Sequence, residues 1–220
     1  MLTNQILEGD SNTILRQFPC SSVDLVVTDP PYLGRYKDRL GRSLANDDRP
    51  ESVLLVYKEI FRVLRPDSYC VTFYGWTAIA GFAEAWANAG FASVGHIVWP
   101  KPYASNIKHT EYRHEAAYLL AKGFPARPPF PLSDVQPWEY SGNKEHPTEK
   151  AVSVIAPLIR AFSRPGDLVL DPFSGSGTTA VAAALNGRNY IAIELERHYC
   201  ELARRRLAAL QRPQAYQEAA

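Results

Sequence analysis

A strand–turn–helix–strand unit near the carboxyl end constrains the fold of this chain more than any other feature. The apolar run 167–170 ends in Asp171 and is followed by a glycine-rich turn at 172–177. A helix comes next, and a second apolar strand, 190–193, ends in Glu194. Because strands and helices alternate along the whole chain, we predict one α/β domain with a doubly wound, mostly parallel sheet covered on both faces.

The other elements follow from apolar periodicity and from the residues that end helices and strands. The further predicted strands are 5–10, 23–28, 69–74, 91–99 and 115–120, and the further predicted helices are 11–18, 50–64, 78–89, 152–162 and 196–210. Pro157 is expected to bend or break its helix. The segment 124–147 is rich in proline and polar residues and is predicted to be loop.

The glycine-rich turn predicts a site for a nucleotide-like cofactor that carries no phosphate. No lysine follows Gly177, so the turn is not a P-loop. Asp171, just ahead of the turn, would repel a pyrophosphate but attract a cation such as S-adenosylmethionine. An acid about 20 residues past such glycines binds ribose hydroxyls, which indicates this role for Glu194. The alternatives are an NAD site and, for Glu194, a cap on the following helix.

A second motif, Asp29-Pro30-Pro31-Tyr32, directly follows the apolar strand 23–28. The exocyclic amino group of a nucleobase is a poor nucleophile because its lone pair is delocalised into the ring. A carboxylate and a carbonyl that accept its two N–H bonds would free that lone pair. Proline fixes φ and brings no competing N–H. The tetrapeptide therefore predicts chemistry on the amino group of a stackable base, and the alternative is a proline turn that only ends a strand.

Asp29 and Asp171 each follow or end a predicted strand. In open α/β sheets, ligands bind outside the carboxyl ends of the strands, where the strand order reverses. We therefore expect the two acids to line one crevice in which a methyl donor and an acceptor base meet.

The two motifs resemble those of the β-type DNA amino-methyltransferases, which modify adenine N6 or cytosine N4. In that family the catalytic motif comes first, the target-recognition segment second and the cofactor motif last, as they do here. The stretch His146-Pro147-Thr148-Glu149-Lys150 fits the segment before the cofactor strand, although Ala151 stands where the family has proline. The resemblance covers roughly residues 4–207 and implies a Rossmann-like, S-adenosylmethionine-dependent methyltransferase fold with one antiparallel strand near an edge.

The resemblance also implies the roles of individual residues and S-adenosylmethionine as the cofactor. The catalytic residues would be Asp29, Pro30, Pro31 and Tyr32, with Tyr32 stacking on a flipped base. The cofactor-binding residues would be Asp10, Thr148, Lys150, Asp171, Pro172, Phe173, Ser174, Gly175, Ser176, Gly177, Thr178 and Glu194. Asp10 would lie near the adenine of the cofactor, and a cap on the helix that follows it is a compatible second role.

Double-stranded DNA is the expected partner, although a net charge of +1 supplies no global basic footprint. The cations must therefore be local. The candidates are Arg35, Lys37 and Arg39 after the catalytic motif, and Lys101, Lys108 and Arg113 in the probable recognition segment 100–146, which is embedded in the single domain 1–220. The alternative for both groups is an ordinary solvated face.

Asp29 also bears on the choice of base. Within the family, aspartate at the head of the tetrapeptide is typical of adenine N6 enzymes and serine of cytosine N4 enzymes, so we predict adenine N6. Cytosine N4 methylation, a non-catalytic DNA-binding protein that senses S-adenosylmethionine, and an NAD-dependent oxidoreductase are the alternatives.

The sequence also argues against several classes of protein. No apolar run approaches the ~20 residues that span a bilayer, and the N-terminus has no signal-peptide pattern. Cys20, Cys70 and Cys200 are isolated, so neither a zinc site nor a disulfide framework is expected. We expect a cytoplasmic enzyme without metal or membrane partner. Dimerisation is common in the family, which makes a homodimer one expected state.

Overall fold

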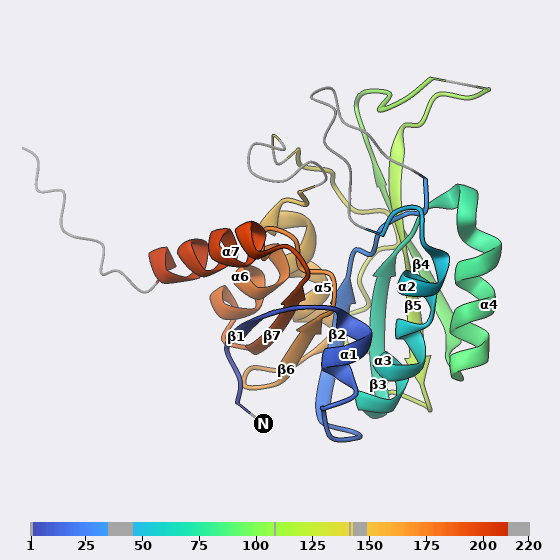
Figure 1. Cartoon of the computed structure of the whole chain (residues 1–220). Helices are drawn as coiled ribbons and strands as arrows, with labels where there is room; N and C mark the ends of the chain where they lie inside the picture. Colours follow the sequence, from blue (N-terminus) through green and yellow to red (C-terminus); the bar gives the residue numbers. More distant parts are fainter. Residues whose placement is uncertain (1, 35–45, 108, 141, 143–148, 211–220) are drawn as a thin grey trace, which may run out of the picture.

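The computed structural model describes residues 2–34, 46–107, 109–140, 142 and 149–210 (Figure 1). Its strands form one sheet in the order β1-β7-β6-β2-β3-β5-β4. The strands are β1 Gln5–Glu8, β2 Val23–Thr28, β3 Leu64–Phe73, β4 Ala92–Pro100, β5 His114–Lys122, β6 Leu168–Asp171 and β7 Asn189–Glu194. The helices are α1 Ser11–Leu15, α2 Pro50–Leu54, α3 Val56–Val63, α4 Ile79–Ala89, α5 Val152–Phe162, α6 Thr178–Leu185 and α7 Arg197–Leu210, with a short 3₁₀ turn at Trp76–Ala78.

Strand direction follows the prediction. β5 runs antiparallel to both of its neighbours, β3 and β4, whereas the pairs among β1, β7, β6, β2 and β3 are parallel. β5 is thus the one antiparallel strand among those described, and it lies next to the edge strand β4. The order reverses between β2 and β6, because β2 leads to β3 on one side and β6 leads to β7 on the other.

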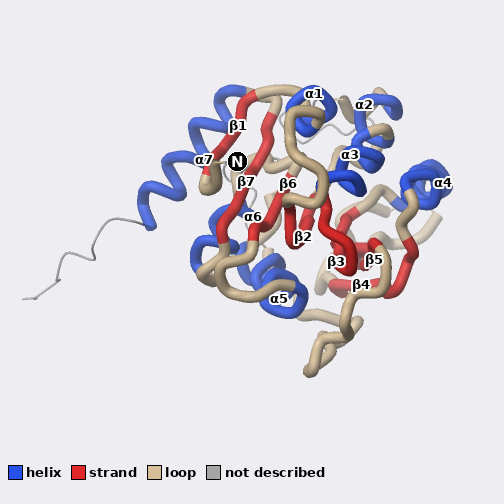
Figure 2. The backbone as a smooth tube through the Cα atoms, turned by 90° about the horizontal axis from the view of Figure 1, so that it is seen from below, coloured by secondary structure: helices blue, strands red, loops and turns tan. Residues whose placement is uncertain are grey.

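Two apolar cores lie on opposite faces of the sheet, as strand alternation requires. In β2, Leu25 and Val27 pack into the core formed with α5, α6 and α7. Val26, between them, packs into the core formed with α1, α2, α3 and α4. Figure 2 shows the two helical layers on either side of the strands. Burial on both faces explains why these strands read as continuous apolar runs.

The structure refines the predicted elements. The predicted helix 50–64 is divided at Leu55 into α2 and α3, although Leu55 itself keeps a helical backbone (φ −65°, ψ −24°). β3 begins at Leu64, earlier than predicted, because residues 68–73 pair with β5 and Leu64 pairs with Val23 of β2. α5 is not broken at Pro157.

Within the described ranges, no helix is long and apolar enough to cross a membrane.

Candidate active site

Asp29 and Asp171 meet at the point where the strand order reverses, as predicted. β2 and β6 are parallel neighbours, with Leu25 beside Val169 and Val26 beside Leu170, so their carboxyl ends share one edge. Both acids line one cavity of about 50 Å³. Other predicted residues in its wall are Lys150, Phe173, Ser174, Gly175, Ser176 and Thr178.

The two carboxylate oxygens of Asp29 differ. Oδ2 accepts a hydrogen bond from Lys150 Nζ at 2.7 Å, whereas Oδ1 is buried and accepts none from the described residues. Burial raises the pKa of Asp29, and the neighbouring Lys150 ammonium opposes this shift only in part. One oxygen is therefore held in place while the other is available to an N–H donor.

Tyr32 is fixed at both ends. Its hydroxyl donates to Glu115 Oε2 (3.2 Å) and accepts from Lys150 Nζ (3.3 Å). Gly75 packs closely against the backbone of Tyr32. A Cβ added to Gly75 would lie 2.3 Å from the Tyr32 carbonyl oxygen. Gly75 lies two residues after the end of β3, and a glycine at such a place is a sequence signal of a close backbone approach.

Lys150 is bound to the catalytic motif. Its ammonium lies 4.0 Å from Glu115 Oε2 and 4.9 Å from the centre of the Phe73 ring, in addition to its bond to Asp29. Burial lowers the pKa of Lys150, but Asp29 and Glu115 outweigh this effect and the net shift is upward. Lys150 is therefore a buried cation whose first partner is Asp29, while its predicted contact with the cofactor stays a prediction.

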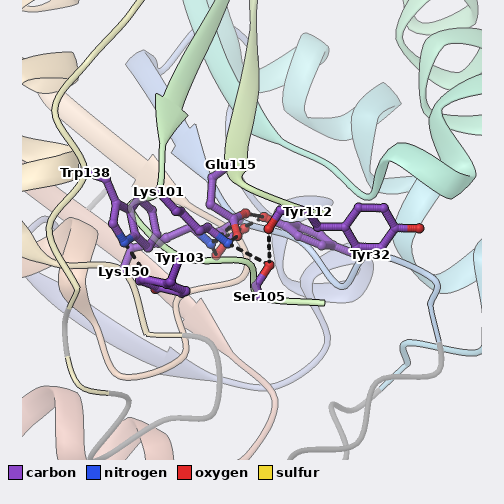
Figure 3. Close-up of polar contacts among 9 residues, drawn as sticks. Tyr32, Lys101, Tyr103, Ser105, Tyr112, Glu115, Trp138 and Lys150 are labelled. Carbon is purple, nitrogen blue, oxygen red and sulfur yellow. Dashed lines mark hydrogen bonds and ion pairs between the residues drawn. The ribbon is translucent and has the colours of Figure 1, made fainter. Parts of the chain in front are cut away.

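Lys101 differs from what its predicted DNA-binding role requires. Its side chain is only 5% exposed and forms an ion pair with Glu115 Oε1. The ammonium also donates to Ser105 Oγ (3.3 Å) and lies 5.2 Å from the centre of the Trp138 ring (Figure 3). A buried, paired ammonium is not presented to a phosphate, because its charge is already neutralised inside the protein.

Glu115 is a residue that the sequence analysis missed. It stands near the start of β5, and it reaches the catalytic motif only because β5 runs antiparallel. Burial pushes the pKa of Glu115 upward, but Lys150 and Lys101 outweigh it and lower the pKa overall. Nothing in a linear pattern around residue 115 marks this contact with Tyr32, which is 83 positions away.

The acid before the glycine-rich turn is buried and hard to ionise. Burial raises the pKa of Asp171 to about 7, against hydrogen bonds from Thr179 and from the Phe173 backbone, which lower it. Asp171 Oδ1 accepts from Phe173 N at 3.0 Å. Nearby, Ser174 Oγ is buried and makes no hydrogen bond with the described residues. A buried carboxylate that a cation would stabilise, beside a free buried hydroxyl, suits a cationic polar ligand.

Glu194 organises the turn. Its Oε2 accepts from Gly175 N (2.8 Å) and its Oε1 from Glu196 N (2.8 Å), just before α7 begins. Both carboxylate oxygens of Glu194 thus bind the protein backbone, and the predicted contact of Glu194 with the ribose stays a prediction. Gly177 has a left-handed backbone (φ +82°), and a Cβ on it would lie 2.6 Å from Ala203 Cβ of α7. The space at Gly177 is therefore required by helix packing, and its predicted contact with the cofactor stays a prediction.

Asp10 caps α1, because its Oδ1 accepts from Thr13 N at 3.0 Å. The next residue, Ser11, contacts the glycine-rich turn at 172–177, because its Oγ donates a hydrogen bond to the carbonyl of Pro172. The cap is thus observed, and the adenine contact of Asp10 stays a prediction.

Among the predicted DNA contacts, Arg113 lies in the described part of the chain. Its side chain is half-exposed, donates to the Pro102 carbonyl and pairs with Glu111 at 3.0 Å. Five predicted site residues lie outside the described residues: Arg35, Lys37, Arg39, Lys108 and Thr148.

This fold and site are those of a nucleobase amino-methyltransferase, and comparison with known proteins agrees. Residues 23–205 match the family model described as DNA methylase. The chain belongs to this family.

Two relatives come from Escherichia coli (strain K12). "Putative methylase YubD" is 49% identical over 209 residues, covering 95% of this chain and 92% of the relative. The DNA adenine methyltransferase YhdJ is 28% identical over 241 residues, covering 92% and 82% respectively.

Two solved structures have the same fold. The complex of M1.HpyAVI with SAM is 25% identical with a TM-score of 0.73, covering 92% of this chain and 98% of the other. The cytosine-N4-specific PvuII DNA methyltransferase has a TM-score of 0.75 and covers 91% and 85% respectively, but its 21% identity supports the fold alone.

Proposed function

We propose that this enzyme methylates the exocyclic amino group of a base flipped out of double-stranded DNA, and that the base is adenine and the atom N6. The observation that carries the proposal is Asp29 Oδ1, a buried acceptor without a partner among the described residues, in the cavity that Asp171 also lines. An aspartate at this position, and a relative named as an adenine methyltransferase, support adenine over cytosine.

As a member of this family, the chain uses S-adenosylmethionine, which supplies an electrophilic methyl group on a sulfonium that leaves as a neutral thioether. The residues present fit such a molecule. Asp171 offers a buried carboxylate, and Ser174 offers a buried hydroxyl without a partner in the described structure. Phe173 adds an aromatic wall to the cavity. We assign Glu194 to the ribose and Asp10 to the adenine end.

Asp29 activates the base. Its Oδ1 accepts one amino N–H and the carbonyl of Pro30 accepts the other, which restores the nitrogen lone pair. Lys150 holds Oδ2, so the carboxylate does not rotate away. The methylated nitrogen must also lose a proton, and Asp29, whose pKa burial raises, is the adjacent acceptor.

Tyr32 binds the flipped base. Extrusion costs a few kcal/mol, because the base loses its stacking and pairing in the duplex. Stacking on an aromatic ring returns on the order of 1–3 kcal/mol. The Tyr32 hydroxyl is already held by Glu115 and Lys150, so less conformational entropy is lost when the ring stacks on the base.

The segment 100–146 is proposed to read the DNA sequence. β4 is parallel to β2, so the connection that leaves β4 starts at the same edge as Asp29 and projects beyond the sheet (Figure 1). The segment also exposes large apolar side chains. They are Tyr103, Ile107, Phe124, Phe130, Val135 and Tyr140. A homodimer and a cytoplasmic location stay predictions.

The test is methyl transfer from isotopically labelled S-adenosylmethionine to unmethylated DNA, followed by digestion and mass spectrometry of the nucleosides. N6-methyladenine is the expected product, whereas N4-methylcytosine would reassign the base. Asp29→Asn should keep the affinity for S-adenosylmethionine and reduce transfer by roughly 10²–10⁴-fold. Asp48→Asn, the same change at an exposed position, should leave transfer unchanged. Full activity of the Asp29 variant would refute its role.

A further inference from the structure

Four charged side chains form an alternating chain from the catalytic motif to the proposed recognition segment. Asp29 contacts Lys150 at 2.7 Å, and Lys150 lies 4.0 Å from Glu115. Glu115 in turn pairs with Lys101. Figure 3 shows both lysine side chains directed toward Glu115, with Trp138 and Tyr103 on one side and Tyr32 on the other.

Stability alone does not account for this chain. The side chains of Lys101 and Lys150 are 5% and 8% exposed, and that of Glu115 is 19% exposed. Moving such charges out of water costs several kcal/mol per ion, and well-packed apolar residues of similar volume are often as stable or more so. A chain of buried charges beside a reaction centre therefore suggests a role in the reaction.

Glu115 is the branch point. Its Oε2 accepts from Tyr32 and lies nearest Lys150, while its Oε1 binds Lys101. Lys150 and Tyr32 are the two groups that would control the base, one through Asp29 and the other by stacking. Removing the charge of Glu115 would weaken the hold on the Tyr32 hydroxyl and take away the second carboxylate near Lys150, whose bond to Asp29 would remain.

Lys101 connects Glu115 to the recognition segment. Its ammonium is held by Ser105 and lies against Trp138, which comes from far along that segment. Trp138 is brought there because residues 134–136 pair with the edge strand β4: Val98 N donates to the Asp134 carbonyl (2.7 Å) and Gln136 N to that of Val98 (2.9 Å).

We propose that Glu115 is a positioning residue for methyl transfer. It holds Tyr32 and Lys150 in the geometry that the flipped base requires, and it links them through Lys101 to the segment that contacts DNA. This inference rests on the proposed function, because the geometry in question is that of the base.

Glu115→Gln tests the proposal, since glutamine keeps the shape of the side chain and loses its charge. Displacement of a positioned group can cost on the order of 10²-fold in rate. We expect a loss of this size in single-turnover transfer, unchanged affinity for S-adenosylmethionine, and partial rescue by Glu115→Asp. Glu84→Gln, the same change on the exposed face of α4, is the matched control and should transfer at the wild-type rate.

A second measurement needs neither DNA nor cofactor. In the ¹⁵N NMR spectrum of lysine-labelled protein, the buried Nζ groups of Lys101 and Lys150 should give protected signals, assigned with Lys101→Arg and Lys150→Arg. Both signals should shift or broaden in Glu115→Gln. If that variant does not fold, Tyr32→Phe is the substitute. It removes the hydroxyl that donates to Glu115 and accepts from Lys150, and it should still slow transfer.

The outcomes separate the two proposals. Wild-type transfer by a folded Glu115→Gln protein would overturn the positioning role and leave the proposed function intact, as would unchanged Nζ signals. Absence of transfer to any DNA by the wild-type protein would overturn the proposed function. In that case the NMR comparison would still decide whether Glu115 organises Lys101 and Lys150.

Discussion

The buried carboxyl of Asp171 should make the stability of the fold depend on pH. Its pKa is about 7 in the folded protein and 3.8 in an unperturbed chain, with burial as the main cause. Because the folded-state pKa is the higher one, the protonated group favours folding. This stabilisation is complete below about pH 4 and is lost as the pH rises through 7.

The magnitude follows from the shift. Each pKa unit corresponds to 1.36 kcal/mol, so a shift from 3.8 to about 7 amounts to roughly 4 kcal/mol at full ionisation. Asp171→Asn keeps an acceptor for the Phe173 N–H but cannot ionise. Relative to the wild type, this variant should therefore gain roughly 4 kcal/mol in the free energy of unfolding between pH 4 and pH 8.

Urea unfolding of both proteins across this range measures the difference directly. Glu194, whose pKa burial also raises, titrates in both proteins and cancels. The charge of Asp29 contributes to the raised pKa of Asp171, so both proteins are compared in the Asp29→Asn background. A difference that stays constant from pH 4 to pH 8 would refute the argument. If Asp171 faces a cationic ligand, S-adenosylmethionine should also bind the wild type more tightly as the pH rises toward 8, and the variant should lose this dependence.

Two glycine substitutions test the close approaches in the site. Gly75→Ala should destabilise the fold by roughly 1–3 kcal/mol and slow methyl transfer, because its Cβ would lie 2.3 Å from the Tyr32 carbonyl oxygen. Thermal unfolding and single-turnover rates check this, and Gly34→Ala, which has open space, should be nearly neutral. Gly177→Ala combines a left-handed backbone with a clash at Ala203 and should cost roughly 2–5 kcal/mol. Gly187→Ala shares the positive φ but meets nothing, so a cost equal to that of Gly177→Ala would contradict the clash.

The sequence predicted the fold well where local patterns determine it. Apolar runs such as 23–28 marked the buried strands, and the helix predicted at 78–89 ends at Ala89, where Gly90 takes a left-handed conformation. The meeting of Asp29 and Asp171 followed from a general property of parallel sheets, namely that ligands bind at the carboxyl ends of strands. The resemblance implied one antiparallel strand near an edge, and the structure identifies it as β5, because no local signal in 114–122 specifies direction.

The parts that the sequence did not predict depend on strand register. Trp99 lies beside Glu115 across the pair β4 and β5, and a shift of one residue would turn Glu115 to the other face of the sheet. Residue type alone could not show that Gly177 is also needed for packing against α7. The contacts of Glu194 with Gly175 and Glu196 likewise depend on where the turn folds back.

Lys101 shows the same dependence on distant contacts. Its place among the cations of the segment 100–146 predicts a DNA contact, whereas the structure buries its side chain and pairs it with Glu115. A buried carboxylate at a reaction centre, however, needs a nearby cation to remain charged. Asp29 and Glu115 are two such acids, and Lys150 and Lys101 are their partners. Lys150 and Lys101 are therefore held in the interior, whereas the half-exposed Arg113 keeps its predicted contact with DNA.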